Sequence, residues 1–204
     1  MRRRRAPRPE NGTTAVTDID ILLRLDRLES RSAIAELPVL YCLAMDERDV
    51  DGITAVFTED ATMRSADGVF DAHGRDAIVR TFQSRFDALG PTNHVTHGHV
   101  VRFDEDRNSA HGIAVGHAEL VRNDVPMVTA LRYRDRYRRV DGVWRIHDRL
   151  MSYMYYLPVS EYEEGLGDSR SMRAYGDLRR ADWPETLRGA DTSWLRRFRP
   201  GYEP

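Results

Sequence analysis

The stretch from Ala110 to Tyr153, AHGIAVGHAELVRNDVPMVTALRYRDRYRRVDGVWRIHDRLMSY, decides the fold class. Small or apolar residues occur at every second position of Ala110–Val121, which is the period of a β-strand. The same period recurs in Met127–Arg139, where Thr129, Leu131, Tyr133 and Tyr137 alternate with arginines. Asp141-Gly142 is a strong hairpin turn, so Val143–Tyr153 is expected to return as a third strand. The stretch therefore predicts an antiparallel sheet joined by hairpins.

Helical periodicity precedes these strands. Apolar residues of 19–28 and of 34–45 recur at helical spacing, with Pro38 expected to kink the second helix and Asp46 to end it. Asp49 is suited to cap a short third helix. Two short strands, another helix and a long strand are expected before the quoted stretch: Ala61–Arg64, Val69–Ala72, a helix after Gly74, and His94–Phe103. Helices followed by hairpin-linked strands predict an α+β domain.

Length and composition limit the classes of protein. The chain has 204 residues, which suits one domain: we expect a tail at 1–17, a folded domain at 18–158 and a C-terminal arm or lid at 159–204. A net charge of −2 gives no general reason for binding nucleic acid, and no apolar run is long enough to span a membrane. Cys42 is the single cysteine and no secretory signal is evident, so a cytoplasmic protein is expected.

Five segments of the chain resemble a known family. Helical periodicity near residue 20 is followed by LPVLYCLAMDERDVDGITAVFTEDATM, HGRDAIVRTF, TNHVTHGHVVRFDEDRNSAHG and RYRDRYRRVDGVWRIHDR. Over about residues 20–155 this order is similar to the SnoaL-like branch of the nuclear-transport-factor-2-like superfamily, with scytalone dehydratase, bile-acid dehydratases and polyketide cyclases. The resemblance implies a cone-shaped α+β barrel, with a bent antiparallel sheet wrapped around helices and an enclosed pocket.

The resemblance also implies a set of site residues. The Tyr-x4-Asp arrangement of the bile-acid dehydratases matches Tyr41 and Asp46, and the catalytic histidine of the family falls on His94. A second catalytic histidine of scytalone dehydratase falls on His117. Four further residues are expected to bind substrate: His97, Met63, and Tyr133 and Tyr153, which replace an Asn and an Arg of the family. From the residues alone, a helix end or turn is the preferred interpretation of Asp46, and Tyr41 and His117 fit core positions.

These side chains suit acid–base chemistry on a small organic molecule. A neutral imidazole takes up a proton near pH 7, and a carboxylate on its other nitrogen fixes the tautomer. We therefore expect a cofactor-independent dehydratase or dehydratase/cyclase that acts on a polycyclic or aromatic-polyketide-like hydroxy compound, with His94 as base and then acid and Asp46 as its orienter. Two alternatives stay open: a cyclase or isomerase without water loss, and a non-catalytic small subunit or ligand-binding protein.

Other patterns favour simpler interpretations. His97 and His99 are expected to share a strand face and suggest a metal site, but no carboxylate or cysteine accompanies them at a ligand spacing, so none is predicted. An arginine stripe is expected to face solvent or another subunit: Arg132, Arg134, Arg136 and Arg138. The resemblance implies a homo-oligomer, a dimer or trimer, that binds neither nucleic acid nor membrane.

Overall fold

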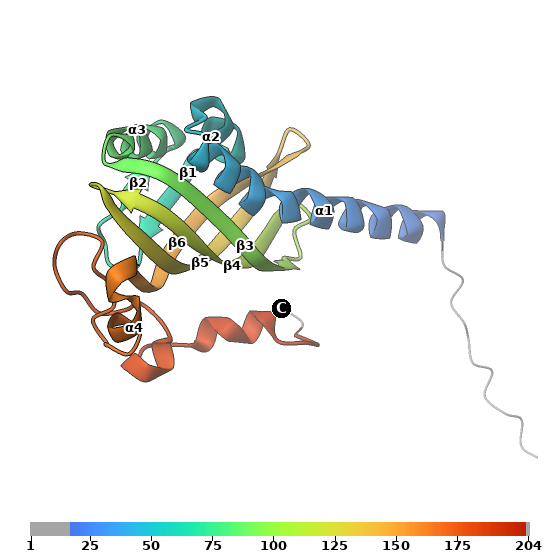
Figure 1. Ribbon diagram of the computed structural model, residues 1–204. Coiled ribbons are helices and arrows are strands. Elements are labelled where there is room, and N and C mark those ends of the chain that lie inside the picture. Colours follow the sequence, from blue (N-terminus) through green and yellow to red (C-terminus); the bar gives the residue numbers. More distant parts are fainter. Residues whose placement is uncertain (1–16, 203–204) are drawn as a thin grey trace, which may run out of the picture.

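The computed structural model describes residues 17–202, and the predicted N-terminal tail lies outside this range except for Thr17. Helix α1 (Asp18–Asp46) begins with a capping box between Thr17 and Asp20 and continues through Pro38 without interruption. The two N-terminal helices expected from the sequence are therefore one helix. Its first turns project beyond the sheet (Figure 1).

Helices and strands follow α1 in the expected order. They are α2 (Val50–Val56), β1 (Phe57–Ser65), β2 (Asp71–His73), α3 (Arg75–Phe86), β3 (Leu89–Phe103), β4 (Ser109–Arg122), β5 (Val125–Val140) and β6 (Val143–Pro158). Asp49 caps α2 and Asp46 ends α1, as predicted. No helix among the described residues is long and apolar enough to cross a membrane.

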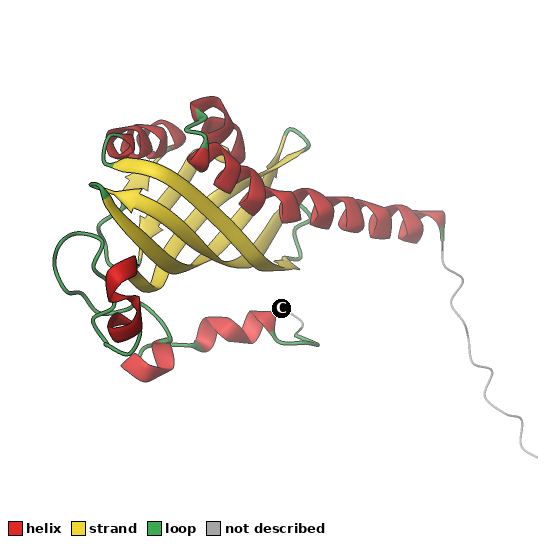
Figure 2. Ribbon diagram, in the orientation of Figure 1, coloured by secondary structure: helices red, strands yellow, loops and turns green. Residues whose placement is uncertain are grey.

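The six strands form one curved, unclosed sheet in the order β2-β1-β6-β5-β4-β3 (Figure 2). Every pair is antiparallel except β1 and β6, which run parallel. The prediction of a purely antiparallel sheet is wrong at this pair, because β1 enters from α2 and lies along β6 rather than in a hairpin with it. The expected cone-shaped α+β architecture is confirmed.

The two faces of the sheet bury different sets of side chains. Inward positions of β4 carry small residues, from Ala110 to Ala118, and pack with α1, α2 and α3 around the main core. A second, smaller cluster of Ala130, Tyr155 and Leu157 lies on the outer face, where Trp183 packs against it. The alternation predicted for β4 therefore separates core from outer face as expected.

The C-terminal arm, residues 159–202, covers part of the outer face. It contains α4 (Tyr162–Gly165) and two helical turns, Glu185–Arg188 and Ser193–Phe198. Arg132 pairs with Glu185 at 2.5 Å and lies over the ring of Trp183, while Arg134 lies over the ring of Trp194. Half of the arginine stripe expected to face solvent or another subunit thus holds the chain's own arm.

Gly112 on β4 allows two rings to approach the sheet closely. A β-carbon added there would lie 2.6 Å from Tyr137 Cε2 and 2.7 Å from His99 Nε2. We predict that Gly112→Ala lowers the free energy of unfolding by about 1–3 kcal/mol, because the buried ring of Tyr137 and the partly buried ring of His99 must shift. Urea denaturation measures the change. Gly167→Ala is the control, since its nearest neighbour would be 4.0 Å away, and an equal loss in both variants would contradict the packing argument.

Candidate active site

The end of α1 and the start of β3 lie against each other. Arg48, just past α1, donates to the carbonyl oxygen of Asp46 at 3.0 Å and to those of Leu89 and Gly90 at 2.8 and 2.5 Å. Its guanidinium also lies over the ring of Phe86. This one side chain therefore holds the first residues of β3 against the last residue of α1.

Asp46 and His94 form a hydrogen-bonded pair at this junction. Asp46 Oδ1 lies 2.6 Å from His94 Nδ1, and the backbone N–H of His94 donates to Asp46 Oδ2 at 2.8 Å. Thr92 donates its hydroxyl to Asp46 Oδ1 at 2.8 Å. An ionised carboxylate only accepts hydrogen bonds, so Nδ1 carries the proton and the lone pair of neutral His94 is on Nε2.

The surroundings favour an ionised Asp46. Burial by itself would raise the pKa of this carboxyl, but the hydrogen bonds donated by His94 and Thr92 outweigh it and hold the pKa below its usual value. The Asp46 and His94 side chains remain 16% and 18% exposed, so the pair is open to a molecule entering from solvent.

A buried ion pair lies deeper on the inner face. Arg149 of β6 is 0% exposed, and its Nε and Nη2 donate to both carboxylate oxygens of Asp135 on β5, at 2.8 and 2.7 Å. Tyr137 donates to Asp135 Oδ2 at 2.7 Å, which leaves its oxygen to accept from His99 Nε2 at 3.0 Å. Burial would lower the pKa of Arg149, but the Asp135 carboxylate outweighs it and raises the pKa further.

Two tyrosines predicted for the site enclose this guanidinium. The Arg149 carbon Cζ lies 4.3 Å from the ring centre of Tyr41 and 4.1 Å from that of Tyr133. The two rings meet edge to face at 5.7 Å. Burial raises the pKa of Tyr41, an effect that Arg149 opposes only in part, so its phenol stays protonated.

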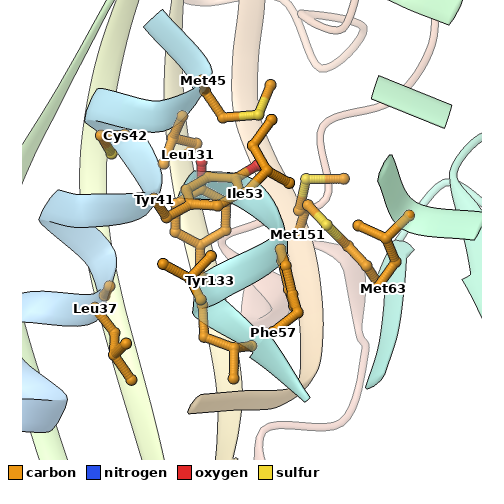
Figure 3. Close-up of a cluster of buried hydrophobic side chains, with 14 of the residues drawn as sticks. Leu37, Tyr41, Cys42, Met45, Ile53, Phe57, Met63, Leu131, Tyr133 and Met151 are labelled. Atoms are coloured by element: carbon orange, nitrogen blue, oxygen red, sulfur yellow. The ribbon is translucent and has the colours of Figure 1, made fainter. Parts of the chain in front are cut away.

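The interior around Tyr41 is filled by side chains (Figure 3). Met45, Met63 and Met151 are each at most 7% exposed and pack in the same core as Tyr41. Neither Asp46 nor His94 lines any of five surface cavities found over the described residues. An enclosed pocket around the pair stays a prediction.

The structure divides the predicted site residues between the two faces. Tyr41, Met63, Tyr133 and Tyr153 belong to or pack against the main core, and Asp46, the last residue of α1, binds His94.

His97 and His117 lie on the outer face, contrary to expectation. Their rings meet at 2.6 Å between His97 Nε2 and His117 Nδ1, beside Tyr155 in an outer cavity of about 490 Å³. A register shift between Thr96 and Gly98 separates His97 from His99, so the two do not share a face. Among residues 17–202, no three histidine, cysteine or acidic side chains converge as metal ligands.

Arg149 and Asp135 were missed in the sequence. The signal for Asp135 was its position: it alternates in phase with Tyr133 and Tyr137, so a charged residue occupies an inward site and requires a buried partner. Arg149 had no comparable signal, because the pairing shifts between Arg136 and Tyr137 away from the register that the hairpin at Asp141-Gly142 implies.

A family model supports this architecture independently. The model of the SnoaL-like domain matches residues 26–150, well over half of the chain. The chain belongs to the SnoaL-like family. The matched segment ends within β6, before the C-terminal arm begins.

Solved structures show the same fold at low sequence identity. The hexachlorocyclohexane dehydrochlorinase LinA-type3 from Novosphingobium barchaimii LL02 is 22% identical, with a TM-score of 0.62 over 67% of this chain and 94% of its own. A scytalone dehydratase-like protein from Novosphingobium aromaticivorans is 20% identical (TM-score 0.61; 76% and 98% covered). ActVI-ORFA from Streptomyces coelicolor is 20% identical (0.52; 61% and 97%). No curated protein sequence matches the chain.

The Asp135–Arg149 pair generates a stability prediction. Asp135→Asn keeps the shape of the side chain but leaves the buried guanidinium without a counter-charge, and we expect a loss of about 3–5 kcal/mol in the free energy of unfolding. Chemical denaturation provides the measurement. Asp135→Leu combined with Arg149→Met removes both charges and should be more stable than Asp135→Asn; the opposite order would show that charge burial is not the cause.

The lowered pKa of Asp46 predicts how the stability of the protein changes in acid. Because its pKa is lower in the folded than in the unfolded chain, its contribution to stability is complete above pH ~4 and is lost as the pH falls through the folded pKa. Wild type should exceed Asp46→Asn in stability at neutral pH, and this difference should shrink in stronger acid. Urea unfolding of both proteins across that range tests this, and a difference independent of pH would contradict it.

Proposed function

We propose that the chain is a lyase that eliminates water from a hydroxylated organic substrate, with Asp46 and His94 as its acid–base pair. The observation that carries the proposal is the 2.6 Å contact between Asp46 Oδ1 and His94 Nδ1, which places the lone pair of neutral His94 on Nε2 of a partly exposed side chain. The proposal needs no cofactor, because side chains of the chain make both proton transfers.

The elimination balances through one histidine. His94 Nε2 takes a proton from the carbon next to a carbonyl, and the electron pair of the broken C–H bond moves to the carbonyl oxygen as an enolate. When this electron pair moves back from the enolate oxygen to form the C=C bond, the C–O bond at the β-carbon breaks. The leaving oxygen takes a proton from the His94 imidazolium. The products are a conjugated alkene and water, and His94 returns to its neutral form. Asp46 stabilises the imidazolium between the two steps.

In this proposal the buried guanidinium of Arg149 stabilises the negative charge on the enolate oxygen. Arg149 is fixed by Asp135 and by the rings of Tyr41 and Tyr133, so it costs little reorganisation when charge develops nearby. Arg149 Nη1 is buried and has no hydrogen-bond partner among the described residues. Tyr41, kept protonated by its burial, supplies a neutral hydrogen-bond donor beside it.

The interior favours an apolar substrate. Met45, Met63 and Met151 border Tyr41, and their unbranched side chains can change rotamer to admit a ring system. Side-chain movement is required, since this interior is filled. Two structural neighbours are described as a dehydrochlorinase and as scytalone dehydratase-like, and both names denote elimination. We therefore extend the proposal to polycyclic or polyketide-like β-hydroxy carbonyl compounds.

Two other functions fit particular observations. A cyclase or isomerase would use the same proton transfer at His94 and differ only in losing no water. A non-catalytic binding subunit is favoured by the filled interior around Tyr41. Product mass separates these cases: elimination lowers it by one water, isomerisation leaves it unchanged, and a binding subunit yields no product.

We predict that His94→Gln lowers kcat/KM for elimination by about 10²–10⁴-fold, because the base is lost. The measurement is product formation by liquid chromatography and mass spectrometry over a panel of polycyclic β-hydroxy ketones. Asp46→Asn should also lose activity. His117→Gln on the outer face is the matched control and should retain activity.

Loss of activity in His117→Gln equal to that in His94→Gln would contradict the site. Absence of turnover by wild type across the panel, together with saturable binding of a panel member, would favour the binding-subunit function instead.

A further inference from the structure

Helix α1 has two apolar stripes on opposite sides. One faces the body of the protein and is buried at Ser30, Ile34, Leu37 and Tyr41. The other is exposed to solvent and consists of Ile21, Leu25, Leu28, Ser32, Ala35 and Val39. The four large side chains of this exposed seam are 46–64% exposed, although each would be stabilised by burial.

The exposed seam has the spacing of a coiled coil. Its members follow one another at intervals of four, three, four, three and four residues, so they occupy the a and d positions of a heptad repeat. Leu25, Ser32 and Val39 are at a, and Ile21, Leu28 and Ala35 are at d. The small side chains in the middle let a second helix approach closely.

Charges beside the seam identify the partner. In the same register, Arg24 and Arg31 occupy g positions, while Glu29 and Glu36 occupy e positions. In a parallel pair of helices, each g residue meets the e residue five positions later on the other helix. Arg24 then meets Glu29 of a second copy, whereas Arg31 is held by its own chain, where it donates to the carbonyl oxygen of Val101 at 3.0 Å. An antiparallel pair would instead place arginine against arginine and glutamate against glutamate.

We propose that α1 forms a parallel coiled coil with α1 of a second copy of this chain, which makes the protein a dimer with its twofold axis along the helix. Because the buried stripe is opposite the seam, the two bodies lie on the outer sides of the helix pair and do not collide. The inference is independent of the proposed catalytic function.

Sedimentation velocity of the full-length protein at micromolar concentrations tests the proposal. Wild type should sediment as a species of about 47 kDa, twice the chain mass of 23.5 kDa. Leu25→Glu combined with Leu28→Glu should give the monomer, because the charges fall inside the seam. Leu40→Glu is the matched control: Leu40 is 46% exposed but lies outside the a and d positions, so this variant should remain dimeric. Circular dichroism confirms that each variant is folded.

A charge exchange tests the parallel orientation. Arg24→Glu alone and Glu29→Arg alone should each weaken the dimer roughly tenfold, since each variant creates two like-charge pairs across the twofold axis. Mixing the two variants should restore association, as each glutamate then meets an arginine.

Three results would overturn the inference. A monomeric wild type would show that the seam is free or is covered by another segment of the same chain. A dimer that persists in the Leu25→Glu, Leu28→Glu variant would place the interface elsewhere. No recovery on mixing the charge variants would exclude the parallel arrangement.

Discussion

The buried ion pair between Asp135 and Arg149 is the constraint around which the inner face is organised. A guanidinium with no exposure is stable only when its charge is matched and its hydrogen bonds are directed, and Asp135 does both from the neighbouring strand. The same guanidinium lies over Tyr41 of α1, so it joins the helix to the sheet. The position of α1 in turn places Asp46, its last residue, beside β3.

Much of the fold could be predicted from the alternation of side chains along strands and from residues typical of helix ends and turns. The long strands, the end of a helix at Asp46, the cap at Asp49 and the hairpin at Asp141-Gly142 are local features, and the structure confirms them. The parallel pairing of β1 with β6 is a contact between distant segments, and no local pattern encodes it. The continuity of α1 through Pro38 was also missed, because the helix face at Pro38 is held by tertiary packing.

The candidate site could be predicted only where it depends on family resemblance and side-chain chemistry. The resemblance led to Asp46, His94 and Tyr41, and the structure brings the first two into contact and packs the third in the core. It misplaced His97 and His117, because the side of a strand on which a residue lies depends on register and on the shift near Gly98. That Asp46, His94 and Tyr41 act in catalysis stays a prediction.

The central claim is that Asp46 holds His94 with its proton on Nδ1 and its lone pair on Nε2. Long-range ¹H–¹⁵N correlation spectra of the ¹⁵N-histidine-labelled protein report the tautomer of each imidazole directly, and His94→Gln assigns the signal. The account predicts the Nδ1–H tautomer for neutral His94, and a loss of this preference in Asp46→Asn. An Nε2–H tautomer in wild type, or the same spectrum in both proteins, would contradict it.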